Sequence, residues 1–146
     1  MSDADLMQLY SRRILGLTAS IPHQGRLKAP DGTASKRSPQ CGSTVQVDVT
    51  MAGERVDDFA QEVRACALGQ ASAAVLGGTV LGRTRDEIAA GRDALSAMLT
   101  DAASPPAAPF AELEALLPAR DYPNRHASIL LAWDATLAAI DAAREG

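Results

Sequence analysis

The chain has 146 residues, of which 47% are hydrophobic, and it carries a net charge of −4 at neutral pH. This size and composition predict one folded domain over residues 1–146 with a buried core. The acidic balance and the lack of a lysine- or arginine-rich block argue against a nucleic-acid partner. No apolar run approaches the roughly 20 residues of a membrane span, and the N-terminal stretch is acidic where a signal peptide is basic. We therefore expect a cytoplasmic protein with no membrane partner.

The first predicted element is a helix. Residues 3–17, "DADLMQLYSRRILGL", repeat hydrophobic side chains at three- and four-residue spacings, and Ser2 or Asp3 is available as a cap. The following stretch, up to residue 40, is rich in Pro, Gly, Ser and Thr and has no regular period. We expect a loop there, with at most one short edge strand.

From Thr44 the sequence alternates between apolar and polar residues, which predicts a half-buried strand. A glycine turn follows at residues 52–55, "AGER", and "VDDFAQEVRA" returns with a looser alternation. The two runs predict an antiparallel hairpin over about residues 44–64. The acidic residues of this region are expected on its solvated face and turn, and they are Asp48, Glu54, Asp57 and Asp58.

The remainder of the chain is predicted to be mainly helical. An alanine-rich helix is expected over about residues 66–80, and Thr84 with Glu87 forms a capping box that begins another helix, or two short ones. We expect a short helix at "FAELEALL", a break at "PARDYPNR", and a long final helix over 127–146. The predicted fold class is therefore α+β, a small antiparallel sheet covered by helices.

The two cysteines, Cys41 and Cys66, lie at similar distances before and after the hairpin turn. Antiparallel strands return such positions to the same end, and a bulge of one or two residues would absorb the difference. Both sulfurs would then face one pocket, with Cys66 near the unpaired amides at the start of a helix. The alternative is that each cysteine is only a small buried apolar residue.

Four segments, in order along nearly the whole chain, resemble the U-type iron–sulfur cluster assembly scaffolds, the group of NifU N-terminal domains, IscU and SufU. They are the leading helix "DLMQLYSRRIL", "SPQCGSTVQVDV", "GERVDDFAQEVRACALGQASAAVL" and "PNRHASILLAWDATLAAI". The second is similar to the family's N-P-x-C-G-D followed by a strand. The last is similar to the P-x-R-x-K-C-A-x-L-A-W close of the SufU branch. This resemblance implies a single NifU/IscU-like domain with a SufE/NifU-like fold.

The resemblance also implies a metal site. In the family three cysteines and an aspartate hold a cluster or zinc, and this chain retains Cys41 and Cys66 in two of those positions. Ser43 stands in the place of the aspartate and Ser128 in the place of the third cysteine. A serine hydroxyl is a poor ligand beside a thiolate or carboxylate. His126 is a further candidate, although a shift of two helical residues rotates it by about 200° from position 128, and a surface histidine is the alternative.

By this resemblance the chain is a scaffold-like binding protein and not an enzyme. It would bind a [2Fe-2S] cluster, iron or zinc transiently through two cysteines. Its implied partners are a cysteine desulfurase that supplies sulfur and apo acceptor proteins that receive the cluster, and a homodimer is an open alternative. Two other functions remain: a metal-free paralogue that binds a partner or regulates it, or a thiol protein in which Cys66 accepts a persulfide and Cys41 resolves it.

Overall fold

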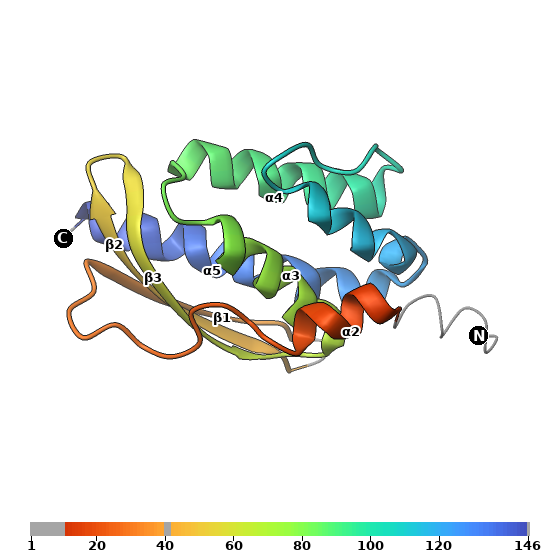
Figure 1. Ribbon diagram of the computed structural model, residues 1–146, viewed down its shortest axis with the longest axis horizontal. Helices are drawn as coiled ribbons and strands as arrows, with labels where there is room; N and C mark the ends of the chain where they lie inside the picture. Colours follow the sequence, from red (N-terminus) through yellow and green to blue (C-terminus); the bar gives the residue numbers. More distant parts are fainter. Residues whose placement is uncertain (1–10, 40–41, 146) are drawn as a thin grey trace.

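The computed structural model describes residues 11–39 and 42–145. Its sheet consists of β1 (Gly32–Arg37), β2 (Thr44–Ala52) and β3 (Arg55–Arg64), antiparallel and in the order β1-β2-β3. The helices gather on one face of this sheet (Figure 1). The predicted α+β class, with a hairpin near residues 44–64 and one edge strand, is therefore confirmed.

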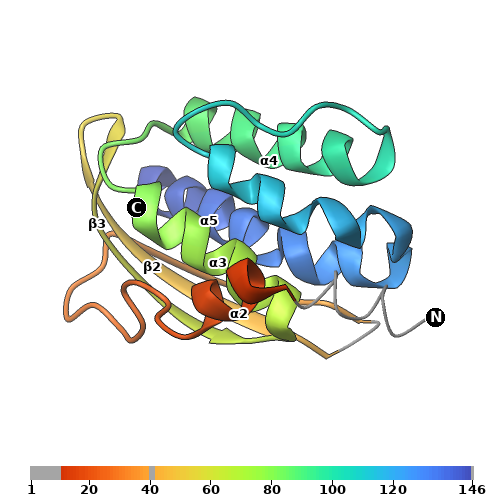
Figure 2. The same ribbon diagram turned by 45° about the vertical axis from the view of Figure 1, so that its right-hand side comes forward.

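The helical elements form two layers above the sheet (Figures 1 and 2). α3 and α5 lie next to each other, and α5 packs against β1 and β2, while α4 and the 3₁₀ segment η1 lie farther from the sheet. In the described part of the chain, no helix is long and apolar enough to cross a membrane. The helices are α2 (Arg12–Thr18), α3 (Ala67–Thr79), α4 (Arg85–Thr100), η1 (Ala111–Asp121), η2 (Pro123–Arg125) and α5 (His126–Glu145).

The hairpin brings the start of β2 beside the end of β3. Thr44 pairs with Arg64 at one end, and Ala52 pairs with Arg55 at the turn, where Gly53 adopts a φ of +62°. A one-residue register shift occurs between Thr50 and Met51. The predicted bulge therefore exists, but it lies at the turn end of the hairpin and not beside the cysteines.

The core forms where the inner face of the sheet meets α3 and α5. Val45, Val47 and Val49 are buried, as their two-residue period predicts. From α5, the Trp133 side chain is fully buried, and its ring contacts Phe110 edge-on with 5.0 Å between the centroids. Burial of such side chains supplies most of the free energy that holds the helices on the sheet.

The predicted helix over residues 3–17 is wrong at Ser11. This residue has extended backbone, with φ −60° and ψ 165°, and its hydroxyl accepts a hydrogen bond from the Ile14 amide at 3.3 Å. That is the geometry of a helix N-cap, so α2 begins at Arg12. Ser2, Asp3 and the other predicted helical residues up to 10 lie outside the described residues.

The chain after residue 83 is more regular than its sequence predicts. The capping box of Thr84 and Glu87 begins one continuous helix, α4. The break predicted for 118–125 is much shorter than expected, because η1 runs through Pro118 to Asp121 and Tyr122 alone separates it from η2. The fixed φ of proline is compatible with 3₁₀ geometry, so Pro118 does not end the segment.

Asp48 is the main correction to the predicted strand pattern. Glu54, Asp57 and Asp58 are exposed as expected, whereas Asp48 is only 1% exposed. The loop before β1 covers this carboxylate on the outer face of the sheet. Arg26 Nε donates to Asp48 Oδ2 at 2.7 Å, the Leu27 amide donates to the same oxygen, and Thr33 donates to Oδ1. A polar residue on the outer face of the sheet is thus buried by a distant segment.

Candidate functional site

Three of the predicted site positions meet at the end of the sheet that holds the start of β2. The hydroxyl oxygens of Ser43 and Ser128 lie 3.0 Å apart, and Cys66 Sγ lies 3.5 Å from Ser128 Oγ. Both serines are buried, and Cys66 is half-buried. We call these three residues the Ser43–Cys66–Ser128 cluster.

The hairpin register explains why the cluster forms. Because Thr44 pairs with Arg64, Ser43 and Cys66 continue from neighbouring strands at the same end of the sheet. Cys66 is the N-cap of α3, with extended backbone and no side-chain capping bond. Ser128 belongs to the first turn of α5, which packs against both the sheet and α3. Three different elements therefore supply the three side chains.

Cys41 lies outside the described residues, but its neighbours are placed. The Ser38 amide donates to the Ser43 carbonyl at 2.8 Å, and the Gly42 amide donates to the Ser38 carbonyl at 2.9 Å. Gly42 has a φ of +71°, which a glycine adopts without strain. These bonds hold Ser38 beside Gly42 and Ser43, where the chain leads into the cluster. That Cys41 and Cys66 face one pocket stays a prediction.

The position of Ser128 depends on a close approach of α3 to α5. A Cβ atom at Gly69 would lie 2.7 Å from Ser128 Oγ, so a larger residue there would displace it. Ser72 strengthens the contact, because its hydroxyl donates to the Ile129 carbonyl at 2.6 Å and accepts from Trp133 Nε1 at 3.0 Å. The sequence analysis did not identify Gly69 or Ser72. The only sequence signal for these two residues is their spacing from Cys66. Cys66, Gly69 and Ser72 are three positions apart, which places them along one side of a helix.

The cluster offers one thiol and two neutral hydroxyls. The two hydroxyls are bonded to each other, which satisfies polar atoms that are costly to bury alone. Among residues 11–39 and 42–145, no group of three or more His, Cys, Asp or Glu side chains is arranged to hold a metal ion. A closed four-ligand zinc site would therefore need donors beyond these residues.

His126 lies at the first residue of α5, directly after η2, and its ring is directed toward η1. Its Nε2 lies 2.9 Å from the Ala119 carbonyl oxygen, so the tautomer that donates there carries its proton on Nε2. This agrees with the rotation expected for a residue two positions before Ser128. Only Nδ1 would remain to take a metal, and ligation by His126 stays a prediction.

Comparison with known proteins places this geometry in a family. No family model matches the sequence. The crystal structure of a nitrogen-fixing NifU-like protein (N-terminal) from Brucella abortus is 42% identical, with a TM-score of 0.93, and the match covers 97% of this chain and 98% of that one. An iron-sulfur cluster assembly scaffold protein IscU from Streptococcus pyogenes serotype M1 is 25% identical over 96% of this chain and 87% of its own.

A third match concerns the fold alone. The crystal structure of a putative iron-sulfur cluster assembly scaffold protein for the SUF system from Fervidobacterium islandicum AW-1 is 20% identical, with a TM-score of 0.82. It covers 92% of this chain and 98% of its own. The α+β fold and the cluster at the end of its sheet define the class of U-type scaffolds. The chain belongs to the U-type iron–sulfur cluster assembly family of NifU N-terminal domains, IscU and SufU, as the sequence motifs predict.

Proposed function

We propose that this protein acts in iron–sulfur cluster assembly as a scaffold that carries a [2Fe-2S] cluster, or iron, on Cys41 and Cys66. The observation that carries the proposal is the Ser43–Cys66–Ser128 cluster. It joins three of the family's four ligand positions, and one of the three is still a cysteine. The fourth position, Cys41, lies two residues before Ser43. Zinc is the alternative metal for the same two sulfurs.

Two thiolates supply half of the four that usually hold a [2Fe-2S] cluster. Ser43 and Ser128 are neutral and bonded to each other, so they are poor replacements for the other half. We infer that the remaining positions are taken by a second copy of the chain or by a partner's thiols. Such incomplete ligation favours release, which suits a protein that passes its cargo to apo acceptor proteins.

The protein acts in this proposal as a carrier and not as an enzyme, and its location is the cytoplasm. A cysteine desulfurase supplies the sulfur, and the acceptors remove the completed cluster. Cys66 is suited to the exchange because it is half-buried rather than enclosed. A partner's reactive group therefore has access to its sulfur without unfolding of the core.

Anaerobic reconstitution with iron and sulfide tests the proposal. We expect cysteine-dependent visible absorbance, with about one [2Fe-2S] cluster for every two chains if two copies supply four thiolates. Cys41→Ser and Cys66→Ser should each abolish it, whereas Ser104→Ala, on an exposed loop, should not. Iron and sulfide that stay bound after both cysteines are replaced would refute the proposal, as would a protein that binds neither.

The hydrogen bond between Ser43 and Ser128 favours a second candidate, a metal-free paralogue that binds or regulates a partner. Two of the family's ligand positions hold neutral hydroxyl groups here, and these groups form a hydrogen bond with each other. In that case replacement of both cysteines by serine would leave the biological role intact. Loss of the role in a double variant that folds normally would exclude this candidate.

A thiol relay is the third candidate, and the partial exposure of Cys66 is the observation that favours it. The Cys66 thiolate would attack the outer sulfur of a donor persulfide, which releases the donor thiolate and leaves a persulfide on Cys66. Attack by Cys41 on Cys66 Sγ would then release hydrosulfide and leave a disulfide between the two residues. Mass spectrometry after incubation with a persulfide donor would show one added sulfur atom on Cys66 if this candidate holds.

A further inference from the structure

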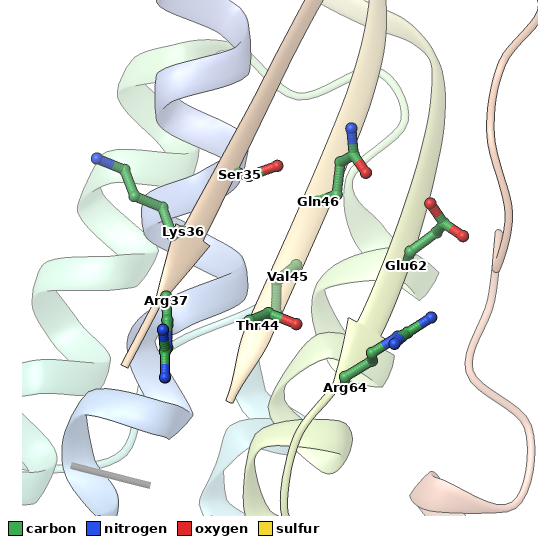
Figure 3. Close-up of a pocket in the computed structure, with 8 residues that line it drawn as sticks. All are labelled: Ser35, Lys36, Arg37, Thr44, Val45, Gln46, Glu62 and Arg64. Carbon is green, nitrogen blue, oxygen red and sulfur yellow. The ribbon is translucent and has the colours of Figure 1, made fainter. Parts of the chain in front are cut away.

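The outer face of the sheet carries a depression of about 380 Å³ beside the Ser43–Cys66–Ser128 cluster. Seven of its eight lining residues have polar or charged side chains, and the lining comes from the site ends of all three strands (Figure 3). The side chains that face outward from these strands are Ser35, Arg37, Thr44, Gln46, Glu62 and Arg64. This face is opposite the one that α5 covers.

The strand register aligns the two arginines of this lining, Arg37 and Arg64, across the sheet. Arg37 pairs with Thr44, and Thr44 pairs with Arg64, so the three residues form one row that we call the arginine row. Neighbouring strands lie about 4.8 Å apart, which places the two arginine backbones about 10 Å from each other. Both guanidinium groups are therefore within reach of one extended segment lying across the strands.

Half of the other twelve lysines and arginines of the chain pair with a carboxylate, and in the part of the chain that the structure describes the two arginines of the row do not. Six arginines pair with carboxylates, namely Arg26, Arg55, Arg83, Arg85, Arg92 and Arg144. Within residues 11–39 and 42–145, neither Arg37 nor Arg64 forms an ion pair. The nearby carboxylate of Glu62 interacts with Arg26, whose pKa is raised mainly by its hydrogen bond to Asp48 and further by the charge of Glu62. Three cations, Lys36, Arg37 and Arg64, and one carboxylate, Glu62, line the depression, so its charge is positive in a chain whose net charge is −4.

The boundary of this surface is set by the loop before β1. Arg26 and Leu27 bind Asp48 and cover the part of the face farther from the site. The arginine row lies beyond that cover, and Arg37 and Arg64 are both exposed. It also adjoins the site, since Thr44 follows Ser43 and Arg64 precedes Cys66 by two residues. A molecule bound to the row would therefore lie next to Cys66.

We propose that the arginine row docks an acidic peptide segment of the partner protein that exchanges sulfur or a cluster at Cys66. The inference rests on the proposed function. Arginine is suited to this role because its planar guanidinium donates two parallel hydrogen bonds to a carboxylate. Two such guanidinium groups on a rigid sheet would fix the position of an acidic segment beside Cys66. The partner's reactive group would be positioned there with it.

Fluorescence anisotropy with a labelled synthetic peptide of alternating glutamate and serine tests the docking surface. The first variant combines Arg37→Glu with Arg64→Glu. The matched control combines Arg12→Glu with Lys28→Glu, which makes the same change in net charge at two other exposed positions. We expect the first variant to bind the peptide about tenfold more weakly or worse, with little change in the control, because each reversed charge turns an attraction into a repulsion. Trp133 fluorescence verifies that both variants are folded.

Amide chemical shifts of the labelled full chain, recorded with the same peptide, supply an independent readout. The proposal expects the largest changes at Arg37, Thr44 and Arg64. Equal losses of binding in the two variants, or shift changes centred elsewhere, would overturn it. Peptide binding that appears only after residues 1–10 are removed would also overturn it, because the row would then bind that segment of this chain. A dimer that the first variant abolishes would overturn it as well, because the row would then bind a second copy of the chain. The peptide assay contains no iron or sulfide, so its failure leaves the scaffold proposal standing.

Discussion

Ser43 and Ser128 share a buried hydrogen bond of 3.0 Å, and Cys66 Sγ lies 3.5 Å from the Ser128 end of that pair. The two serines stand where the motifs of the family place an aspartate and a cysteine. Their bond keeps the two segments together without a metal and without buried charge. Stability and metal binding can therefore be separated at this site.

A double-mutant cycle should measure the stabilising effect of this bond. Ser43→Ala and Ser128→Ala should each lower the free energy of unfolding by about 1 kcal/mol, and their coupling should be about 0.5–1.5 kcal/mol, as for a typical buried hydrogen bond. Urea unfolding followed by the fluorescence of Trp133, the single tryptophan, gives the four values. Strictly additive losses would show that the two hydroxyls do not stabilise the fold through each other.

Restoring the family's donors should restore a zinc site. The variant that combines Ser43→Asp with Ser128→Cys would offer three thiolates and a carboxylate with Cys41 and Cys66, a set that suits tetrahedral zinc. We expect it to retain about one zinc ion per chain through gel filtration, while the parent protein loses zinc under the same conditions. A chromogenic chelator measures the zinc released.

Cys66→Ser in the restored variant is the control for this experiment. It removes one donor from the side of the site that α3 supplies, and zinc should then be lost. Zinc that stays bound without Cys66 would mean that the metal lies at another place. A restored variant that folds but takes up no zinc would mean that Cys41 does not face the cluster.

The hairpin and its two ends were predictable because they depend on local patterns. The two-residue period of Val45, Val47 and Val49 assigns one face to the core, and the turn fixes the register that brings Ser43 toward Cys66. Ser128 could be assigned to the site only through the family's motif, since its contact with Ser43 spans 85 positions in the sequence. Long-range contacts of this kind have no local signal.

The same reasoning explains where the predictions were wrong. Asp48 alternates like a solvated residue, but Arg26, 22 positions earlier, returns to bury it. A strand pattern tells which side a residue faces and not whether a loop covers that side. Proline at 118 predicts a break because it ends α-helices, yet it lies inside a 3₁₀ segment. At Asp48 the tertiary arrangement outweighed the local rule, whereas at Pro118 the rule for α-helices did not apply to 3₁₀ geometry.

Gly69→Ala should disturb the site from within α3. The added Cβ would approach Ser128 Oγ to 2.7 Å and the Ala65 Cβ to 2.9 Å, so Ser128 must move. Alanine gains about 1 kcal/mol of helix propensity, but overpacking of this kind costs about 1–3 kcal/mol, and we expect a net loss. Urea unfolding measures the stability, and the rate of alkylation of Cys66 should rise as Ser128 withdraws.

Gly78→Ala is the matched control, because nothing lies within 4 Å of a Cβ at that position of the same helix. It should stabilise the protein by about 1 kcal/mol or less and leave the alkylation rate unchanged. If both alanine variants behaved alike, the close packing of Gly69 against Ser128 would have no energetic effect.

Asp48→Asn should destabilise the fold in a pH-dependent way. Burial by itself opposes ionisation of Asp48, but the hydrogen bonds from Arg26, Thr33 and the Leu27 amide outweigh it and lower the pKa of the carboxyl. A pKa lowered by folding contributes stability above the unfolded value of about 3.9, and this contribution is lost as the pH falls toward the folded value. At neutral pH we expect a loss of about 2 kcal/mol, since an asparagine cannot replace the charge-assisted bonds to Arg26.

Urea titrations of Asp48→Asn at pH 7 and below pH 4 check both the size and the sign of this effect. The difference from the parent protein should shrink at the acidic pH, where Asp48 of the parent protein is becoming protonated. Asp57→Asn removes the same charge from an exposed position on β3 and should change stability little at either pH. A loss for Asp48→Asn that is constant with pH would mean that the bonds act through geometry alone and not through the charge of the carboxylate. A loss that grows toward acidic pH would contradict the lowered pKa itself.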